Sequence, residues 1–257
     1  MTGVPVVTAA ALAVTLALLG WRLRWLTAAG ALAAAGVGTA VLWGGGFPGG
    51  IVLAVFFTSG SLLSQAAARR ASAEPGHESR TARQVLANGG WAALGALGIP
   101  STAAGWAVLG GALAAAQADT WATEFGTYSR QPPRLITDFT PVRAGASGGV
   151  TPLGTAAGVA GAGLVAAVAH LAVTPGGVPL ATLLGGVAGM LSDSLLGATL
   201  QAKFHCDTCD VETERRVHGC GAKAARVRGV SWIDNDAVNL LGTTVGAAVA
   251  LAWWYAT

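Results

Sequence analysis

Long apolar stretches separated by short polar or glycine-rich breaks dominate the chain. Residues 25–68 and 144–192 contain no formally charged side chain. A helix needs about 20 apolar residues to cross the hydrocarbon core of a bilayer, whereas helices of a water-soluble domain must present a polar face. The pattern predicts an all-α, polytopic membrane protein that forms a single integral membrane domain over residues 1–257. Apolar runs between charges and Pro/Gly breaks predict about eight transmembrane helices (six to eight), at roughly 4–20, 26–43, 49–66, 84–99, 102–118, 150–173, 178–200 and 236–255.

Composition agrees with a membrane location. Hydrophobic residues make up 53% of the chain and charged residues 11%, against about 25% charged residues in soluble domains. The 38 glycines follow no G-X-Y period, which excludes collagen, and they favour close helix packing in lipid. No basic stripe with interleaved aromatic residues is present, so the net charge of +3 does not indicate a nucleic-acid partner.

The basic residues predict the orientation. All 15 lysines and arginines fall on one side of an eight-span topology. The loops on the other side, at residues 44–48, 99–101 and 174–177, carry no charge. By the positive-inside rule the charged side faces the cytoplasm and both termini lie outside. We therefore expect an integral protein of the cell (inner) membrane.

Polar side chains at membrane depth are costly and often functional. We expect four groups of them at the cytoplasmic ends of the spans. Carboxylates and amide oxygens there suit Mg²⁺ together with phosphate groups. The alternatives are an interhelical hydrogen bond for Asn88 and a pairing with a nearby arginine for Asp119. The groups are Arg83 with Asn88, Asp119 with Thr123 and Glu124, Arg143 with the glycine turn described next, and Asp193 with Asp234, Asp236 and Asn239.

A glycine- and serine-rich turn precedes the sixth predicted span. Ser147, Gly148 and Gly149 stand there ahead of a predicted helix start, where backbone N–H groups and the positive end of the helix dipole favour anions. Arg143 can add charge-assisted contacts to a phosphate. The turn lacks the G-K-[ST] ending of a Walker loop.

The cytoplasmic loop at residues 201–235 contains all three cysteines. Cys206 and Cys209 form C-x₂-C, and His218 and Cys220 form H-x-C. This set suits a structural zinc knuckle, because four protein ligands close the tetrahedral site. His205 competes as the fourth ligand, and unligated thiols are the alternative state. A structural disulfide is disfavoured on the reducing side of the membrane.

Six segments resemble the transmembrane protein 19 family, which includes the plant phytyl-phosphate kinase. In order they are RQVLANGG, ADTWATEFG, PRLIT, VRAGASGGVTPLG, LSDSLLGATLQ and DNDAVNLL, and the resemblance runs from about residue 59 to the C-terminus. It implies transfer of a phosphoryl group from a nucleoside triphosphate, CTP in the plant case, to an isoprenoid monophosphate. Many members have a lysine after the third span. This chain has none there, which makes Arg69 or Arg70 the possible phosphate contact.

The resemblance and the polar groups together suggest a CTP-dependent kinase. It would convert phytyl or geranylgeranyl phosphate to the diphosphate among membrane lipids at the cytoplasmic face. The alternative is a transporter or lipid flippase that uses the same acidic face. A CDP-alcohol phosphotransferase is disfavoured, since its D-G-x₂-A-R signature is absent, and an inactive scaffold is a third possibility. In the kinase hypothesis Mg²⁺ is held by Asp119, Asp193 and either Asp234 or Asp236. Arg83 stabilises the charge on the phosphoryl group during transfer, and Glu124 and Thr123 support the metal ligands. The residues expected to bind phosphates are Arg143, Ser147, Gly148, Gly149, Asn88 and Asn239.

Overall fold

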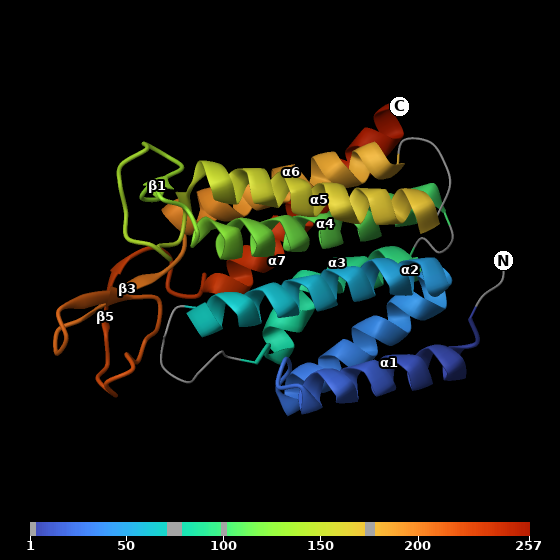
Figure 1. Ribbon diagram of the computed structural model, residues 1–257, viewed down its shortest axis with the longest axis horizontal. Coiled ribbons are helices and arrows are strands. Elements are labelled where there is room, and N and C mark those ends of the chain that lie inside the picture. Colours follow the sequence, from blue (N-terminus) through green and yellow to red (C-terminus); the bar gives the residue numbers. More distant parts are fainter. Residues whose placement is uncertain (1–3, 71–78, 99–101, 173–177) are drawn as a thin grey trace.

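The computed structural model is a bundle of helices with small strands at one end (Figure 1). It describes residues 4–98, 102–172 and 178–257, except for residues 71–78. Within this part of the chain the helices are α1 Val6–Arg22, α2 Ala28–Arg70, α3 Ala82–Gly98, α4 Ala103–Gly126, α5 Pro152–Ala172, α6 Val178–Thr199 and α7 Asn235–Ala256. The strands are β1 Arg134–Leu135, β2 Gly149–Val150, β3 Lys203–Cys206, β4 Val211–Thr213 and β5 Ala225–Arg228.

The predicted count of eight helices is not confirmed, because the second and third predicted spans both lie in α2. This element is broken at Gly46, whose φ of 65° is not helical, and Pro48 follows inside the same element. Proline cannot donate the helical hydrogen bond and its ring displaces the preceding turn. Figure 1 shows the two halves of α2 running at an angle to each other.

Four helical segments in the described residues are long and apolar enough to cross a membrane. They are Ala28–Ala66 within α2, Pro152–Leu171 within α5, and the whole of α6 and α7. α1 is apolar but shorter, with 17 residues.

Helix α4 forms the centre of the bundle. Its residues 104–118 are all buried, and it contacts α3, α5, α6 and α7. The interfaces are close because they are built from glycine and alanine. A Cβ on Gly111 would stand 2.4 Å from the Gly246 carbonyl oxygen of α7, and one on Gly189 of α6 would stand 2.4 Å from the Ala115 Cβ. These contacts fix the rotation of α6 and α7 against α4.

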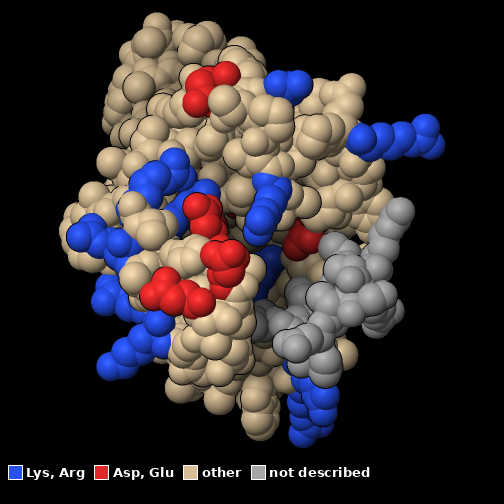
Figure 2. Space-filling view, turned by 90° about the vertical axis from the view of Figure 1, so that its left-hand side faces the viewer, with Lys and Arg blue, Asp and Glu red and all other residues tan. Residues whose placement is uncertain are grey.

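The strands lie at one end of the bundle, which we call the charged end, and the start of α1 and the end of α7 lie toward the other end (Figure 1). β1 pairs antiparallel with β2, and β3 stands between β4 and β5 in a second antiparallel sheet. Figure 2 shows lysine, arginine, aspartate and glutamate side chains gathered on this end. The second sheet falls within the predicted cytoplasmic loop at residues 201–235. The cytoplasmic orientation of this end stays a prediction.

Candidate functional site

A polar cavity of about 560 Å³ opens at the charged end, within the size range of small-molecule sites. Helices α4, α5 and α6 form its walls, together with the connection between α4 and α5. Its polar lining includes Asp119, Thr123, Arg130, Ser147, Thr151, Asp193, Ser194, Gln201, Glu214 and Asn235.

The lining of the polar cavity includes two carboxyl groups from different helices. Asp119 of α4 interacts with Asp193 of α6 through its side chain, and α7 passes close enough that a Cβ on Gly242 would be 3.3 Å from Asp193 Oδ2. Two carboxylates in contact repel each other when both are ionised. Such a pair needs a shared proton or a nearby cation, and carboxylate oxygens are the ligands that Mg²⁺ prefers.

A small cavity of about 10 Å³ adjoins the carboxyl pair. It is lined by Asp119 and Asp193 and also by Asn88 of α3 and Asn239 of α7. This volume holds about one water-sized group. The structure thus brings together four of the predicted site residues, from four helices.

A third cavity is largely apolar and measures about 270 Å³. It lies between α1, α2 and α3, and Arg80, Gln84 and Asn88 form its polar part. Arg80 is half-buried and its guanidinium lies over the rings of Phe56 and Phe57, at 5.6 and 5.7 Å from their centroids. Burial lowers the pKa of Arg80 to about 10, while the charge of Glu124 acts to raise it. Arg80 therefore remains a cation at neutral pH.

The predicted glycine turn packs directly on α6. Gly148 has φ of 80°, and a Cβ there would stand 2.5 Å from the N, Cα and Cβ of Ala198. The Gly148 carbonyl accepts a hydrogen bond from the Ile136 N–H at 3.0 Å, beside the pairing of β1 with β2. Only glycine meets both the positive φ and the close approach.

The same turn leads into the N-terminus of α5. Thr151 Oγ1 accepts a hydrogen bond from the Gly154 N–H at 3.0 Å, and Pro152 stands at the first helical position, where its missing N–H costs nothing. Thr151, Gly154 and Thr155 line the polar cavity. The positive end of the α5 dipole and Arg130 therefore lie beside it and favour an anion there.

Asp234 and Asp236 both pair with Arg83. Arg83 Nη2 is 2.8 Å from Asp234 Oδ2 and Arg83 Nε is 3.5 Å from Asp236 Oδ2. Asp234 also caps α7, since its Oδ1 accepts the Ala237 N–H at 3.0 Å. Neither these two carboxylates nor Arg83 belong to the linings described above. Asp234, a predicted Mg²⁺ ligand, is thus the cap of α7. It forms an ion pair with Arg83, the arginine predicted to stabilise the transferring charge.

Two replacements of Asp234 distinguish its contribution as the helix cap of α7 from that of its ion pair with Arg83. We expect Asp234→Ala to destabilise the folded protein by about 1 kcal/mol through loss of the cap. Asp234→Asn should lower stability by clearly less than Asp234→Ala, because asparagine also caps helices and the exposed pair with Arg83 contributes little. Thermal unfolding of both variants in detergent measures the difference. Equal losses would contradict the capping role.

The remaining predicted residues are distributed around the cavity. Thr123 lines it, one turn after Asp119. Gly149 also lines it, but its N–H donates to the Ala146 carbonyl at 3.0 Å, so that donor is already engaged. Arg143 is exposed on the turn and is not among the lining residues. Glu124 accepts a hydrogen bond from Ser64. The side chains of Arg69 and Arg70 lie outside the described part of the chain.

Three residues at the cavities carried no motif that marked them in the sequence. Arg80 and Arg130 counted only as basic loop residues for orientation. Glu214 follows β4 and accepts hydrogen bonds from Ser147 and from Gln201 Nε2, the latter at 2.9 Å. Glu214 reaches the glycine turn because of the path that β3 and β4 take. The sequence of these short strands shows no hydrophobic periodicity from which that path could be predicted. The four predicted zinc ligands also come together, in a separate cluster next to β3.

Comparison with known proteins places the chain in a family. A family model described as "Integral membrane protein DUF92" matches residues 11–247. "Protein PGR" of Arabidopsis thaliana is 33% identical over 140 residues, which cover 50% of this chain and 47% of the plant protein. The "Uncharacterized membrane protein MJ0933" of Methanocaldococcus jannaschii is 31% identical over 251 residues, which cover 92% of this chain and 89% of that protein. No solved structure matches.

These matches agree with the helical, apolar character of the chain and with the predicted membrane class. The narrower resemblance to the transmembrane protein 19 family stays a prediction, since neither the family model nor these two relatives carry that name. The chain belongs to the DUF92 family of integral membrane proteins.

Proposed function

We propose that the protein transfers a phosphoryl group from a nucleoside triphosphate, CTP in the first instance, to an isoprenoid monophosphate. The observation that carries this proposal is the shared lining of the three cavities. Asn88 lines both the apolar and the small cavity, and Asp119 and Asp193 line both the small and the polar cavity. A lipid tail in the apolar cavity and a nucleotide in the polar cavity would therefore adjoin, with Asn88 and the carboxyl pair between them.

The apolar cavity suits the prenyl tail. Leu12, Leu16, Phe47 and Ile51 contribute to its lining, and Arg80 stands in its polar part. An arginine cation there favours an anionic headgroup over a neutral one. In this arrangement the lipid phosphate lies near Asn88, beside the carboxyl pair.

The polar cavity suits the triphosphate. Arg130 and the positive end of the α5 helix dipole lie beside the cavity, and both favour phosphates. Asp119 and Asp193 fit Mg²⁺, because this ion is usually held by one or two carboxylates plus substrate phosphates. Bound there, the ion would neutralise charge on the phosphates.

The reaction needs positioning more than a dedicated base. An oxygen of the lipid monophosphate attacks the γ-phosphorus of the triphosphate. The bond between that phosphorus and the β-bridging oxygen breaks, and the nucleoside diphosphate leaves with the electron pair. The acceptor phosphate already carries a nucleophilic oxygen, so no histidine is required.

A direct assay tests the proposal. The protein purified in detergent is incubated with γ-labelled CTP or ATP and with phytyl or geranylgeranyl monophosphate, with Mg²⁺ or with EDTA. We expect label in the lipid diphosphate only when Mg²⁺ is present. Absence of transfer with both nucleotides and both lipids would contradict the proposal. Transport of a lipid phosphate by reconstituted vesicles would then favour the transporter or flippase.

Filling the apolar cavity tests where the tail binds. Ala34 lines this cavity on α2, whereas Leu32 on the same helix is 77% exposed. We expect Ala34→Phe to raise the KM for geranylgeranyl phosphate about tenfold or more, since it excludes part of the tail, and to leave the KM for CTP unchanged. Leu32→Phe is the matched control and should change neither constant. Equal behaviour of the two variants would place the tail elsewhere.

A further inference from the structure

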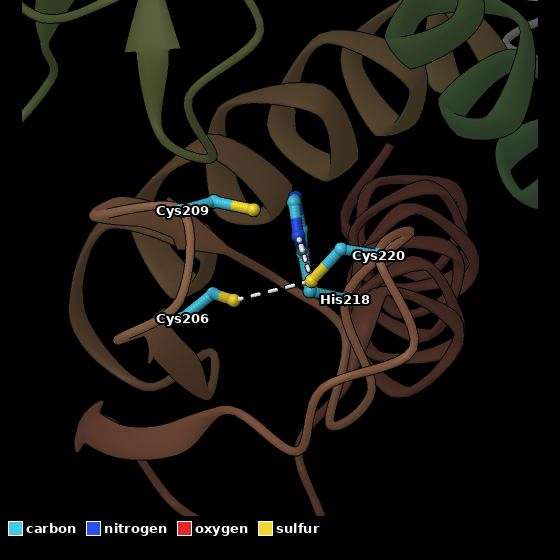
Figure 3. A group of neighbouring side chains, drawn as sticks. All are labelled: Cys206, Cys209, His218 and Cys220. Carbon is cyan, nitrogen blue, oxygen red and sulfur yellow. Dashed lines mark hydrogen bonds between the residues drawn. The ribbon is translucent and has the colours of Figure 1, made fainter.

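The sheet β3–β5 contains a second cluster of reactive side chains, separate from the cavities. Figure 3 shows Cys206, Cys209, His218 and Cys220 directed toward a common point. Their ligand atoms all lie within 4.8 Å of one another. Cys206 is buried and His218 is half-buried, while the other two are exposed.

Two separations between the ligand atoms match those of a tetrahedral metal site. Zn–S bonds of about 2.3 Å and Zn–N bonds of about 2.0–2.1 Å place two sulfurs about 3.8 Å apart and a sulfur and a nitrogen about 3.5 Å apart in a tetrahedron. Cys206 Sγ is 3.7 Å from Cys220 Sγ, and His218 Nδ1 is 3.3 Å from Cys220 Sγ. The cysteines are free thiols, and a sulfur pair at 3.7 Å is far longer than the disulfide bond of about 2.05 Å.

Two tight turns build the cluster, each bringing two ligands. After β3, the N–H groups of Cys209 and Asp210 both donate to the Cys206 carbonyl, at 3.2 and 2.8 Å. In the second turn the His218 N–H donates to the Ala222 carbonyl at 2.9 Å, and the Gly221 N–H donates to the His218 carbonyl at 2.8 Å. The ligands are thus held by backbone geometry on two facing turns.

The segment around the cluster has almost no apolar core of its own. Between residues 203 and 229 the described buried side chains are Phe204 and Cys206. A region of this size without a core usually needs a disulfide or a metal to hold its loops. The cluster lies where such a link is required.

We propose that Cys206, Cys209, His218 and Cys220 bind one structural Zn²⁺ that fixes the sheet β3–β5 against the mouth of the polar cavity. The chemistry of three thiolates and one imidazole favours zinc and closes the coordination shell. Glu214 lies between the two ligand pairs in sequence and bonds to Ser147 and Gln201. The metal therefore holds the hairpin from which Glu214 reaches the glycine turn.

The geometry selects His218 and not His205 as the fourth ligand. His205 Nε2 lies 3.3 Å from Asp210 Oδ1 and 3.8 Å from Asp207 Oδ1, and His205 is not a member of the cluster. His205→Asn is therefore the matched control for His218→Asn.

Metal analysis of the full chain in detergent tests the proposal. We expect one zinc per chain in protein purified without chelator, full zinc content in His205→Asn, and loss of more than about half of the zinc in His218→Asn and Cys206→Ser. Substitution of Co²⁺ should give the thiolate-to-metal charge-transfer absorption of a sulfur-rich tetrahedral site. A wild-type protein that neither contains nor takes up zinc, or a disulfide among the three cysteines, would overturn the proposal. The proposal would also be overturned if the zinc content fell in His205→Asn and not in His218→Asn.

A measurement on the unmutated protein guards against variants that fail to fold. Removal of zinc by a chromophoric chelator should increase amide hydrogen exchange in residues 203–229 and at the glycine turn, while α5, α6 and α7 keep their protection. Unchanged exchange after complete zinc removal would contradict the role in fixing the sheet. These readouts do not depend on phosphoryl transfer, so failure of the kinase proposal leaves them intact.

Discussion

Asp119→Asn and Asp193→Asn are each expected to lower the rate of lipid-phosphate phosphorylation at least about a hundredfold. Either change removes a carboxylate from the pair that faces both the small and the polar cavity. A bound metal ion supplies several kcal/mol of charge stabilisation in the transition state, and about 1.4 kcal/mol corresponds to a factor of ten in rate. Initial rates with labelled CTP over a range of Mg²⁺ concentrations measure the effect.

The matched control for this prediction is Asp234→Asn. Asp234 is 44% exposed, pairs with Arg83 and lines none of the three cavities. We expect this variant to retain activity within about threefold of the unmodified protein, because asparagine preserves the helix cap. If Asp234→Asn loses as much activity as Asp119→Asn, the result would support a Mg²⁺ site of three carboxylates and contradict a site formed by Asp119 and Asp193 alone. Full turnover in both Asp119→Asn and Asp193→Asn would contradict the proposal that these two carboxylates bind the catalytic Mg²⁺.

Gly148→Ala is expected to disable the protein more than any other change in the glycine turn. Its backbone has a positive φ, which costs an L-residue roughly 1–2 kcal/mol, and the added Cβ would meet the Ala198 backbone at 2.5 Å. The backbone of α6 cannot yield as a flexible side chain would, so the turn must move away. A displacement of about 1 Å at a reaction centre can cost on the order of a hundredfold in rate.

Gly145→Ala separates backbone strain from packing. Gly145 has a similar φ of 82°, but a Cβ there would meet nothing within 4 Å. We expect it to lower stability by about the strain alone, roughly 1–2 kcal/mol, and to keep most of the activity. Thermal unfolding and initial rates of the two variants give the comparison. Equal effects of both changes would show that contact with Ala198 does not position the turn.

Much of the fold followed from the spacing of apolar runs, but the helix count did not. The uncharged stretch around Gly46 and Pro48 contains the expected break, and the chain bends there within one helical element. Hydropathy records where side chains are apolar. It does not record whether the backbone between two apolar runs forms a separate loop or a kink.

The candidate site was only partly predictable for a different reason. Asp119, Asp193, Asn88 and Asn239 stood out as polar groups in apolar surroundings, and all four meet at the small cavity. Asp234 had the same sequence signature but caps α7 and pairs with Arg83. Spacing along one helix gives the face on which a residue lies, but not which face of a neighbouring helix it meets.

The sequence alone determined the membrane class, the approximate spans, the side on which charges gather and the residue types that can bind a metal. These properties depend on local composition and on the length needed to cross a bilayer. The tertiary structure decided which carboxylates form a pair, that His218 and not His205 joins the cysteines, and that Arg80, Arg130 and Glu214 belong to the cavities. Those outcomes depend on the rotation and depth of each helix. The close glycine–alanine contacts of α4 with α6 and α7 fix both. Contacts of this kind join segments that are distant in the sequence, so no single stretch of the chain predicts them.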